Sequence, residues 1–271
     1  MSALPLFLEA RFFIINNTLH SLKRESYLKI FIIFSFLVSF WIGAFLLFFK
    51  GFSYFYLFPG VGPLLIERAS GLIIAGIFYM LLISSAFTSF ATIFRSDEVG
   101  FFLSFPVSHN EAFFYKFIET FILSSWAVLF LILPLFLAYG LTQGLGIGFY
   151  IFSSISSIFF IFISTSLGAI VTVFFARYFP KKSFIKKAII LILPAVLFFF
   201  YAFRSTQAQT PESTGTGYVL NFMLKHTDFL QFAFFPNYWL STAITSVAHN
   251  DMAGFYFYFL LLFVTSLFLL E

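Results

Sequence analysis

The sequence predicts an all-α membrane protein with six transmembrane helices. Hydrophobic residues make up 61% of the chain and charged residues 10%, whereas soluble domains contain about 45–50% and about 25%. The apolar residues are also gathered in long stretches, and a helix that crosses a bilayer needs about 20 of them in a row. The predicted spans are 30–49, 71–94, 120–140, 147–176, 188–203 and 254–270.

Residues 1–27, which precede the first span, predict an amphipathic helix. Apolar side chains recur there at steps of three and four, as they do on one face of a helix. We expect this helix to lie in the membrane interface, and the alternative is an ordinary packed helix. Its apolar face is formed by Leu8, Phe12, Ile15, Leu19 and Leu22.

The first two spans are joined by an aromatic-rich loop of a composition suited to the headgroup region. Ile30–Phe49 has 20 residues without a charge and Gly71–Phe94 has 24. Within the second span, Ser85, Ala86 and Ser89 form a face of small residues. Such a face lets another helix approach closely.

The third and fourth spans are separated by a short turn, so they must run antiparallel. The third contains Pro134, a candidate for a kink. The fourth, 147–176, has 30 uncharged residues and is rich in Ser and Thr. We expect these hydroxyls to bond backbone carbonyls one turn back or to face another helix. The alternative is that they line a hydrophilic transport path.

Residues 204–253 form the longest polar stretch, between the fifth and sixth spans, and a short helix is predicted within it at 237–248. Orientation follows from the positive-inside rule. With the N-terminus inside, the inner segments hold 6 + 5 = 11 Lys and Arg and the outer segments hold 4. The N-terminus is therefore predicted to be cytoplasmic and 204–253 extracytoplasmic. Because the chain stops at Glu271 directly after the sixth span, we interpret it as a fragment or the N-terminal half of a longer protein.

Motifs for chemistry are absent from the sequence. It has no GxxxxGK[ST] phosphate loop, no HExxH and no Cys. The predicted spans also carry no charged or His residue at mid-depth, where ion-driven transporters usually place one. We therefore expect no catalytic residue, no metal site and no cofactor, and we expect that the chain is not an enzyme.

A compact polar segment, 95–120, lies between the second and third spans. Ser96 or Asp97 can cap a short helix there, and Pro106 ends it. Ser108 and Glu111 then form a capping box, in which the hydroxyl and the carboxylate each accept from the other residue's backbone N–H. The segment is thus predicted to be an ordered helical element at a membrane face.

This segment resembles the cytoplasmic loop between the second and third spans of ABC-2-type exporter permeases. In that family, acidic residues are followed by a Leu-rich turn, by Pro-Ile/Val-Ser and by a Lys in the next helix. The corresponding residues are Asp97, Glu98, Phe102, Leu103, Pro106, Val107, Ser108, Lys116 and Glu119. Residues 235–240, FPNYWL, are similar to an external segment of a bacterial subgroup of ABC exporters.

The resemblance implies a permease subunit of the bacterial inner membrane that exports a substrate by means of a separate cytoplasmic ABC ATPase. It also implies pairing of permease halves as a homodimer or heterodimer, surrounded by membrane lipid, with no nucleic-acid partner. The segment would be a coupling helix that contacts the ATPase; the alternative is that its apolar residues only anchor the loop in the headgroup layer. The coupling residues would be Asp97, Glu98, Val99, Phe101, Phe102, Leu103, Pro106 and Ser108.

A function of another class fits the same uncharged spans. The chain could be a membrane scaffold or assembly subunit that transports nothing and binds a partner through residues 204–253. The sequence does not specify a substrate for the first function or a partner for the second.

Overall fold

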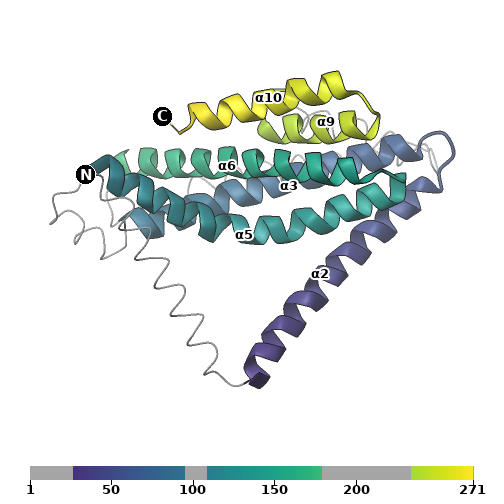
Figure 1. The fold of residues 1–271 in the computed structure, drawn as a ribbon. Coiled ribbons are helices and arrows are strands. Elements are labelled where there is room, and N and C mark those ends of the chain that lie inside the picture. The colour runs from purple at the N-terminus through teal and green to yellow at the C-terminus, as the bar shows by residue number, and fades with distance from the viewer. Residues whose placement is uncertain (1–26, 95–108, 179–232, 271) are drawn as a thin grey trace, which may run out of the picture.

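The structure, a computed structural model, describes residues 27–94, 109–178 and 233–270. In these ranges the regular structure is helical (Figure 1). The helices are α2 Tyr27–Tyr56, α3 Gly62–Ser89, the π-helical turn η1 Phe90–Phe94, α5 His109–Gln143, α6 Ile147–Tyr178, α9 Pro236–Ala248 and α10 Met252–Phe268.

Four helices in the described ranges are long and apolar enough to cross a membrane. They are Tyr27–Tyr56, Gly62–Thr92, Phe113–Gln143 and Ile147–Arg177. This confirms the prediction of an all-helical membrane protein, and each of the four covers one of the first four predicted spans. The count of six is not confirmed. The predicted span 188–203 lies outside the described residues, and α10, at 17 residues, is shorter than the four.

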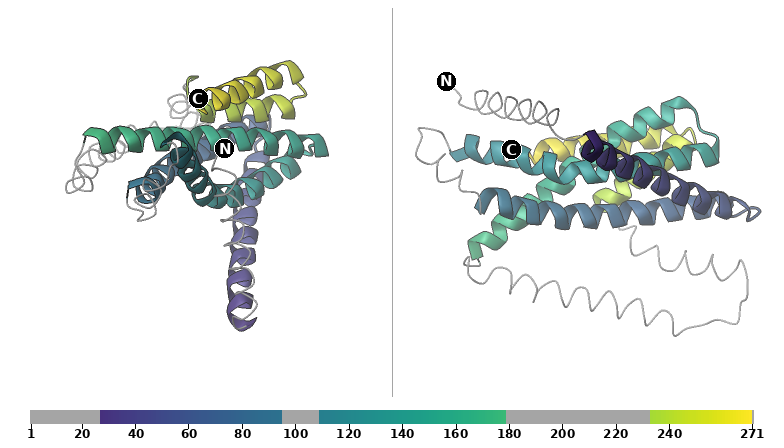
Figure 2. Two further views of the ribbon diagram at one scale, coloured as in Figure 1. Left: turned by 60° about the vertical axis from the view of Figure 1, so that its left-hand side comes forward. Right: turned by 90° about the horizontal axis from the view of Figure 1, so that it is seen from below.

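The centre of the molecule is a bundle of α3, α5 and α6 (Figures 1 and 2). α9 and α10 run side by side and cover one face of α6, while α2 leaves the bundle at a steep angle toward its N-terminal end. α2 remains attached to α5 through two ring pairs, Phe40 with Phe130 and Phe52 with Tyr139, each with centroids 6.1 Å apart.

The turn between α5 and α6 has the antiparallel geometry expected from its length. The Leu145 N–H donates to the Gly140 carbonyl at 2.9 Å, and Gly144 has φ +67°, a conformation that favours glycine. A Cβ at Gly140 would stand 2.7 Å from Cζ of Tyr150. A side chain at position 140 would therefore require the Tyr150 ring to move.

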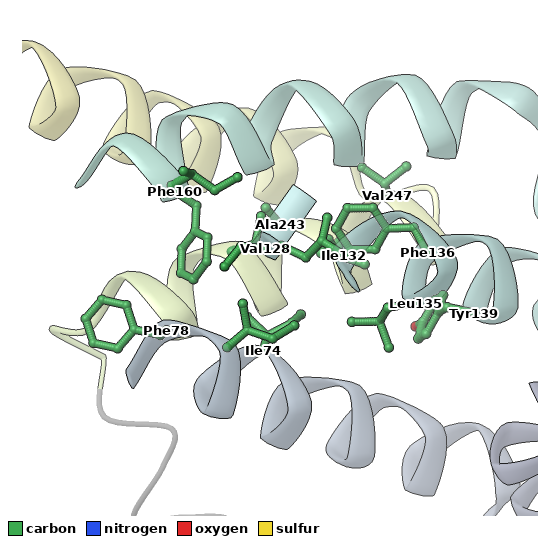
Figure 3. Packing of buried hydrophobic residues seen from close by; sticks show 14 of the residues in the cluster. Ile74, Phe78, Val128, Ile132, Leu135, Phe136, Tyr139, Phe160, Ala243 and Val247 are labelled. Atoms are coloured by element: carbon green, nitrogen blue, oxygen red, sulfur yellow. The ribbon is translucent and has the colours of Figure 1, made fainter. Parts of the chain in front are cut away.

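The helix predicted at 237–248 is present as α9, which belongs to the bundle. Pro236 occupies its first turn, where a missing N–H costs nothing. Leu240, Ala243 and Ile244 are each at most 2% exposed in the core that α9 shares with α3 and α6. Figure 3 shows this core, with Phe78 of α3 and Phe160 of α6 facing each other at 6.0 Å.

α3 and α6 cross at the face of small residues that the sequence predicts on the second span. Thr172 Oγ1 of α6 donates to the Ala86 carbonyl of α3 at 2.8 Å. A Cβ built on Gly168 would collide with Ser85 Oγ and stand 2.9 Å from the Leu82 carbonyl oxygen. The two backbones are thus as close as a glycine permits.

Candidate functional site

The eight predicted coupling residues, from Asp97 to Ser108, lie outside the described residues. Their helix and their contacts therefore stay predictions, as does the interfacial helix predicted at 1–27. The structure does describe the two elements that flank the segment, η1 and the start of α5. Both lie at the same end of the bundle (Figure 1).

At this end, α3 changes its helical pitch. The last turn of α3 passes directly into the π-helical turn η1, Phe90–Phe94, and the Phe90 N–H is shared between the carbonyls of Ala86 and Phe87. Single π turns inside α-helices occur frequently at functional sites, because one extra residue in the turn redirects the side chains that follow. Here the redirected residue is Thr92.

Thr92 joins η1 to α5 through a hydroxyl pair. Its Oγ1 lies 2.8 Å from Oγ1 of Thr120, and either oxygen can be the donor. If Thr92 donates, Thr120 passes its own proton on to the Lys116 carbonyl, 2.9 Å away. If Thr120 donates, Thr92 gives its proton to the Thr88 carbonyl, 3.0 Å away. The chain of hydrogen bonds can therefore run in either direction with every donor used.

One turn before Thr120, α5 buries a charge. Lys116 is only 3% exposed, and its Nζ donates to Oε2 of Glu119 at 2.9 Å. The ammonium also lies 5.7 Å from the ring centroid of Tyr115, within the range of a cation–π interaction. We name Thr92, Lys116, Glu119 and Thr120 the polar cluster.

The three-residue spacing of Lys116 and Glu119 suits an ion pair on one helix face, but sequence reasoning missed that Lys116 is buried. Charged groups inside membrane proteins are costly, and they tend to pair with one another and to mark functional positions. One feature of the sequence could have indicated this burial. Lys116 lies between two aromatic residues, Tyr115 and Phe117, at the start of an apolar span. Both neighbours are at least 92% buried.

Five hydroxyls of α6 behave as the sequence predicts. Their donors go to carbonyls one turn earlier, so these protons are already used within the helix. The residues are Ser156, Ser157, Ser164, Thr165 and Ser166, with donor–acceptor distances of 2.8 to 2.9 Å.

The polar cluster is suited to transmitting movement. The Thr92–Thr120 hydrogen bond joins η1 to α5, the two elements that flank residues 95–108, and the Lys116–Glu119 ion pair lies within α5. A displacement of the segment would act on Thr92 and Lys116 together. Because the surrounding helices are tightly packed, such a displacement would reach the bundle core.

Comparison with known proteins gives one finding. A family model described as "Putative ATP-binding cassette" matches residues 21–270. No curated protein matches, and no solved structure matches.

This match corrects the functional prediction. That prediction, an exporter permease subunit whose ATP hydrolysis resides in a separate subunit, is wrong, because the matched description names an ATP-binding cassette. The prediction relied on the missing phosphate loop, an absence that excludes one way of binding ATP and says little about the family as a whole. The scaffold alternative is not better supported by the match.

Proposed function

Because the chain belongs to the ATP-binding cassette family matched over residues 21–270, we propose that it is a membrane protein that works in an ATP-dependent transport system. Four helices of the described ranges are long and apolar enough to cross a membrane. In this proposal the bundle changes its conformation in step with ATP binding, and the nucleotide-dependent force enters at the polar cluster.

The observation that carries the proposal is a pair of inter-helix hydrogen bonds at the end of the bundle next to residues 95–108, Thr92–Thr120 and Thr172–Ala86. The Thr92–Thr120 hydrogen bond joins α3 and α5 directly next to residues 95–108. A hydroxyl pair with two possible donor directions can persist while the helices shift slightly. The charge distribution supports a cytoplasmic location for this end, since 11 of 15 Lys and Arg then lie inside.

We infer that the N-terminus faces the cytoplasm of a bacterial cell and that the 97–108 segment contacts the ATP-binding part of the system. Pairing with a second membrane unit is a further proposal. The distribution of Lys and Arg supports the first, the family match supports the second, and the resemblance of the loop supports all three.

ATP photolabelling tests whether the chain works in such a system. The tagged chain is purified in mild detergent from the membranes in which it is made, with everything that stays bound, and is exposed to azido-ATP. We expect labelling that excess ATP suppresses and that AMP does not. Membranes without the tagged chain, taken through the same purification, are the control. A folded preparation in which nothing is labelled above that control would contradict the proposal.

A further inference from the structure

Two buried hydroxyls at the end of the bundle opposite to the polar cluster have no hydrogen-bond partner among the described residues. They are the Tyr139 hydroxyl of α5 and Ser153 Oγ of α6. Both residues are 1% exposed. Buried hydroxyls in folded proteins are bonded to protein or to ordered water in the large majority of cases, because an unbonded one costs free energy.

The two hydroxyls lie at the same level of the bundle. The Tyr139 ring stacks on Phe149, with centroids 5.5 Å apart and an interplanar angle of 15°. Ser153 follows Phe149 by four residues on α6, so both occupy one face of that helix. Figure 3 shows Tyr139 at the edge of the core, beside Leu135 and Phe136.

α3 adds a third polar group at this level. Residues of α3 contact residues of α6 that come 82 or 86 positions later in the chain. Phe78 packs on Phe160, and the Ala86 carbonyl accepts from Thr172. The same separation places Ser153 level with residues 67–71. Glu67 lies there, next to Ile66, which packs in the same core cluster as Tyr139.

Glu67 connects this interior level with the surface. Its side chain is 21% exposed, and Oε1 lies 3.1 Å from Nε2 of His249, whose side chain is 62% exposed. Ser70, one turn further along α3, gives its own proton to the Glu67 carbonyl at 2.8 Å and does not compete for the carboxylate. The carboxylate can therefore accept a hydrogen bond from inside the bundle while it faces His249 outside.

We propose that Tyr139, Ser153 and Glu67 form an internal binding site for a water molecule, which bridges the two hydroxyls to the carboxylate. A buried water needs two to four polar partners, and these three groups supply that number. The proposal is independent of the proposed function, because it rests on unbonded hydroxyls and makes no use of ATP.

Hydroxyl-radical footprinting by synchrotron radiolysis detects the water directly, since radicals formed from a bound water oxidise the side chain beside it. In the intact chain in detergent we expect oxidation of Tyr139 at several times the rate of Phe160, an equally buried aromatic residue of the dry core. Replacing Glu67 by Leu should lower the Tyr139 rate toward that of Phe160. A Tyr139 rate equal to that of Phe160 in the unaltered chain would overturn the proposal.

A stability measurement also tests the water site, because the direction in which the midpoint of thermal unfolding changes depends on whether the hydroxyl is bonded. If Tyr139 is bonded to water, Tyr139→Phe should lower the midpoint of thermal unfolding, whereas removal of an unbonded hydroxyl should leave it unchanged or raise it. Ser153→Ala should behave likewise. Ser157→Ala is the matched control, because Ser157 is equally buried but donates to the Ser153 carbonyl within its own helix. A rise in the midpoint for Tyr139→Phe would refute the water site.

Discussion

Gly168→Leu is expected to force α3 and α6 apart and to destabilise the bundle by about 3 kcal/mol, the upper part of the range for overpacking a tight core. Even the Cβ of alanine would stand 2.9 Å from the Leu82 carbonyl oxygen and 3.0 Å from the Ala86 nitrogen. Both are backbone atoms, so no side-chain rotation relieves the clash. Gly168→Ala should therefore have an intermediate effect of about 1–2 kcal/mol.

The measurement is the free energy of unfolding in mixed micelles, followed by helical circular dichroism during titration with a denaturing detergent. Gly76→Ala is the matched control, because Gly76 lies in α3 and an added Cβ there would have nothing within 4 Å. It should gain up to about 1 kcal/mol from helix propensity. If Gly168→Leu proved as stable as the Gly76 variant, the close crossing of α3 and α6 would be refuted.

Lys116→Met is expected to destabilise the end of the bundle next to residues 95–108 by about 3 kcal/mol. The substitution keeps the length of the side chain but leaves the Glu119 carboxylate without its ammonium partner at 2.9 Å. Removing one member of a buried ion pair costs about 3–5 kcal/mol, and the lower end applies because the Glu119 side chain is 16% exposed. The same unfolding titration measures the loss.

The double variant Lys116→Met with Glu119→Leu distinguishes two causes of lost stability: a buried carboxylate that has lost the Lys116 ammonium, and lost packing of the Lys116 side chain. Because it removes both charges of the pair, most of the lost stability should return. A double variant as unstable as Lys116→Met alone would show that the ion pair is not what Lys116 contributes.

The sequence predicted the helices well because long uncharged stretches have few other stable forms in a bilayer. It located α9 from its composition alone, and it identified the face of Ser85 and Ala86 that α6 approaches. It could not identify Gly168 as the point of closest approach. Which glycine meets which helix depends on the crossing geometry, and that geometry is a property of the packed bundle.

The polar cluster was only partly predictable. A spacing of three between Lys116 and Glu119 indicates an ion pair, but it says nothing of burial, which Tyr115, Phe117 and the neighbouring helices create. The pairing of Thr92 with Thr120 joins residues 28 positions apart and depends on the π turn, which leaves no clear signal in FATIF. The functional prediction failed for another reason: it treated the absence of one ATP-binding motif as evidence against the whole activity.

The most direct test of the account is a distance measurement between α5 and α6 with and without nucleotide. Because the chain has no Cys, spin labels can be attached to cysteines introduced at Phe113 and Ile170, which are 46% and 52% exposed at the end of the polar cluster. Leu141 and Ile147, at 56% and 80%, form the matched pair at the opposite end of the same helices. The account predicts that ATP with vanadate shifts the 113–170 distance and leaves the 141–147 distance unchanged. Identical 113–170 distances with and without nucleotide, in a preparation that binds ATP, would contradict it.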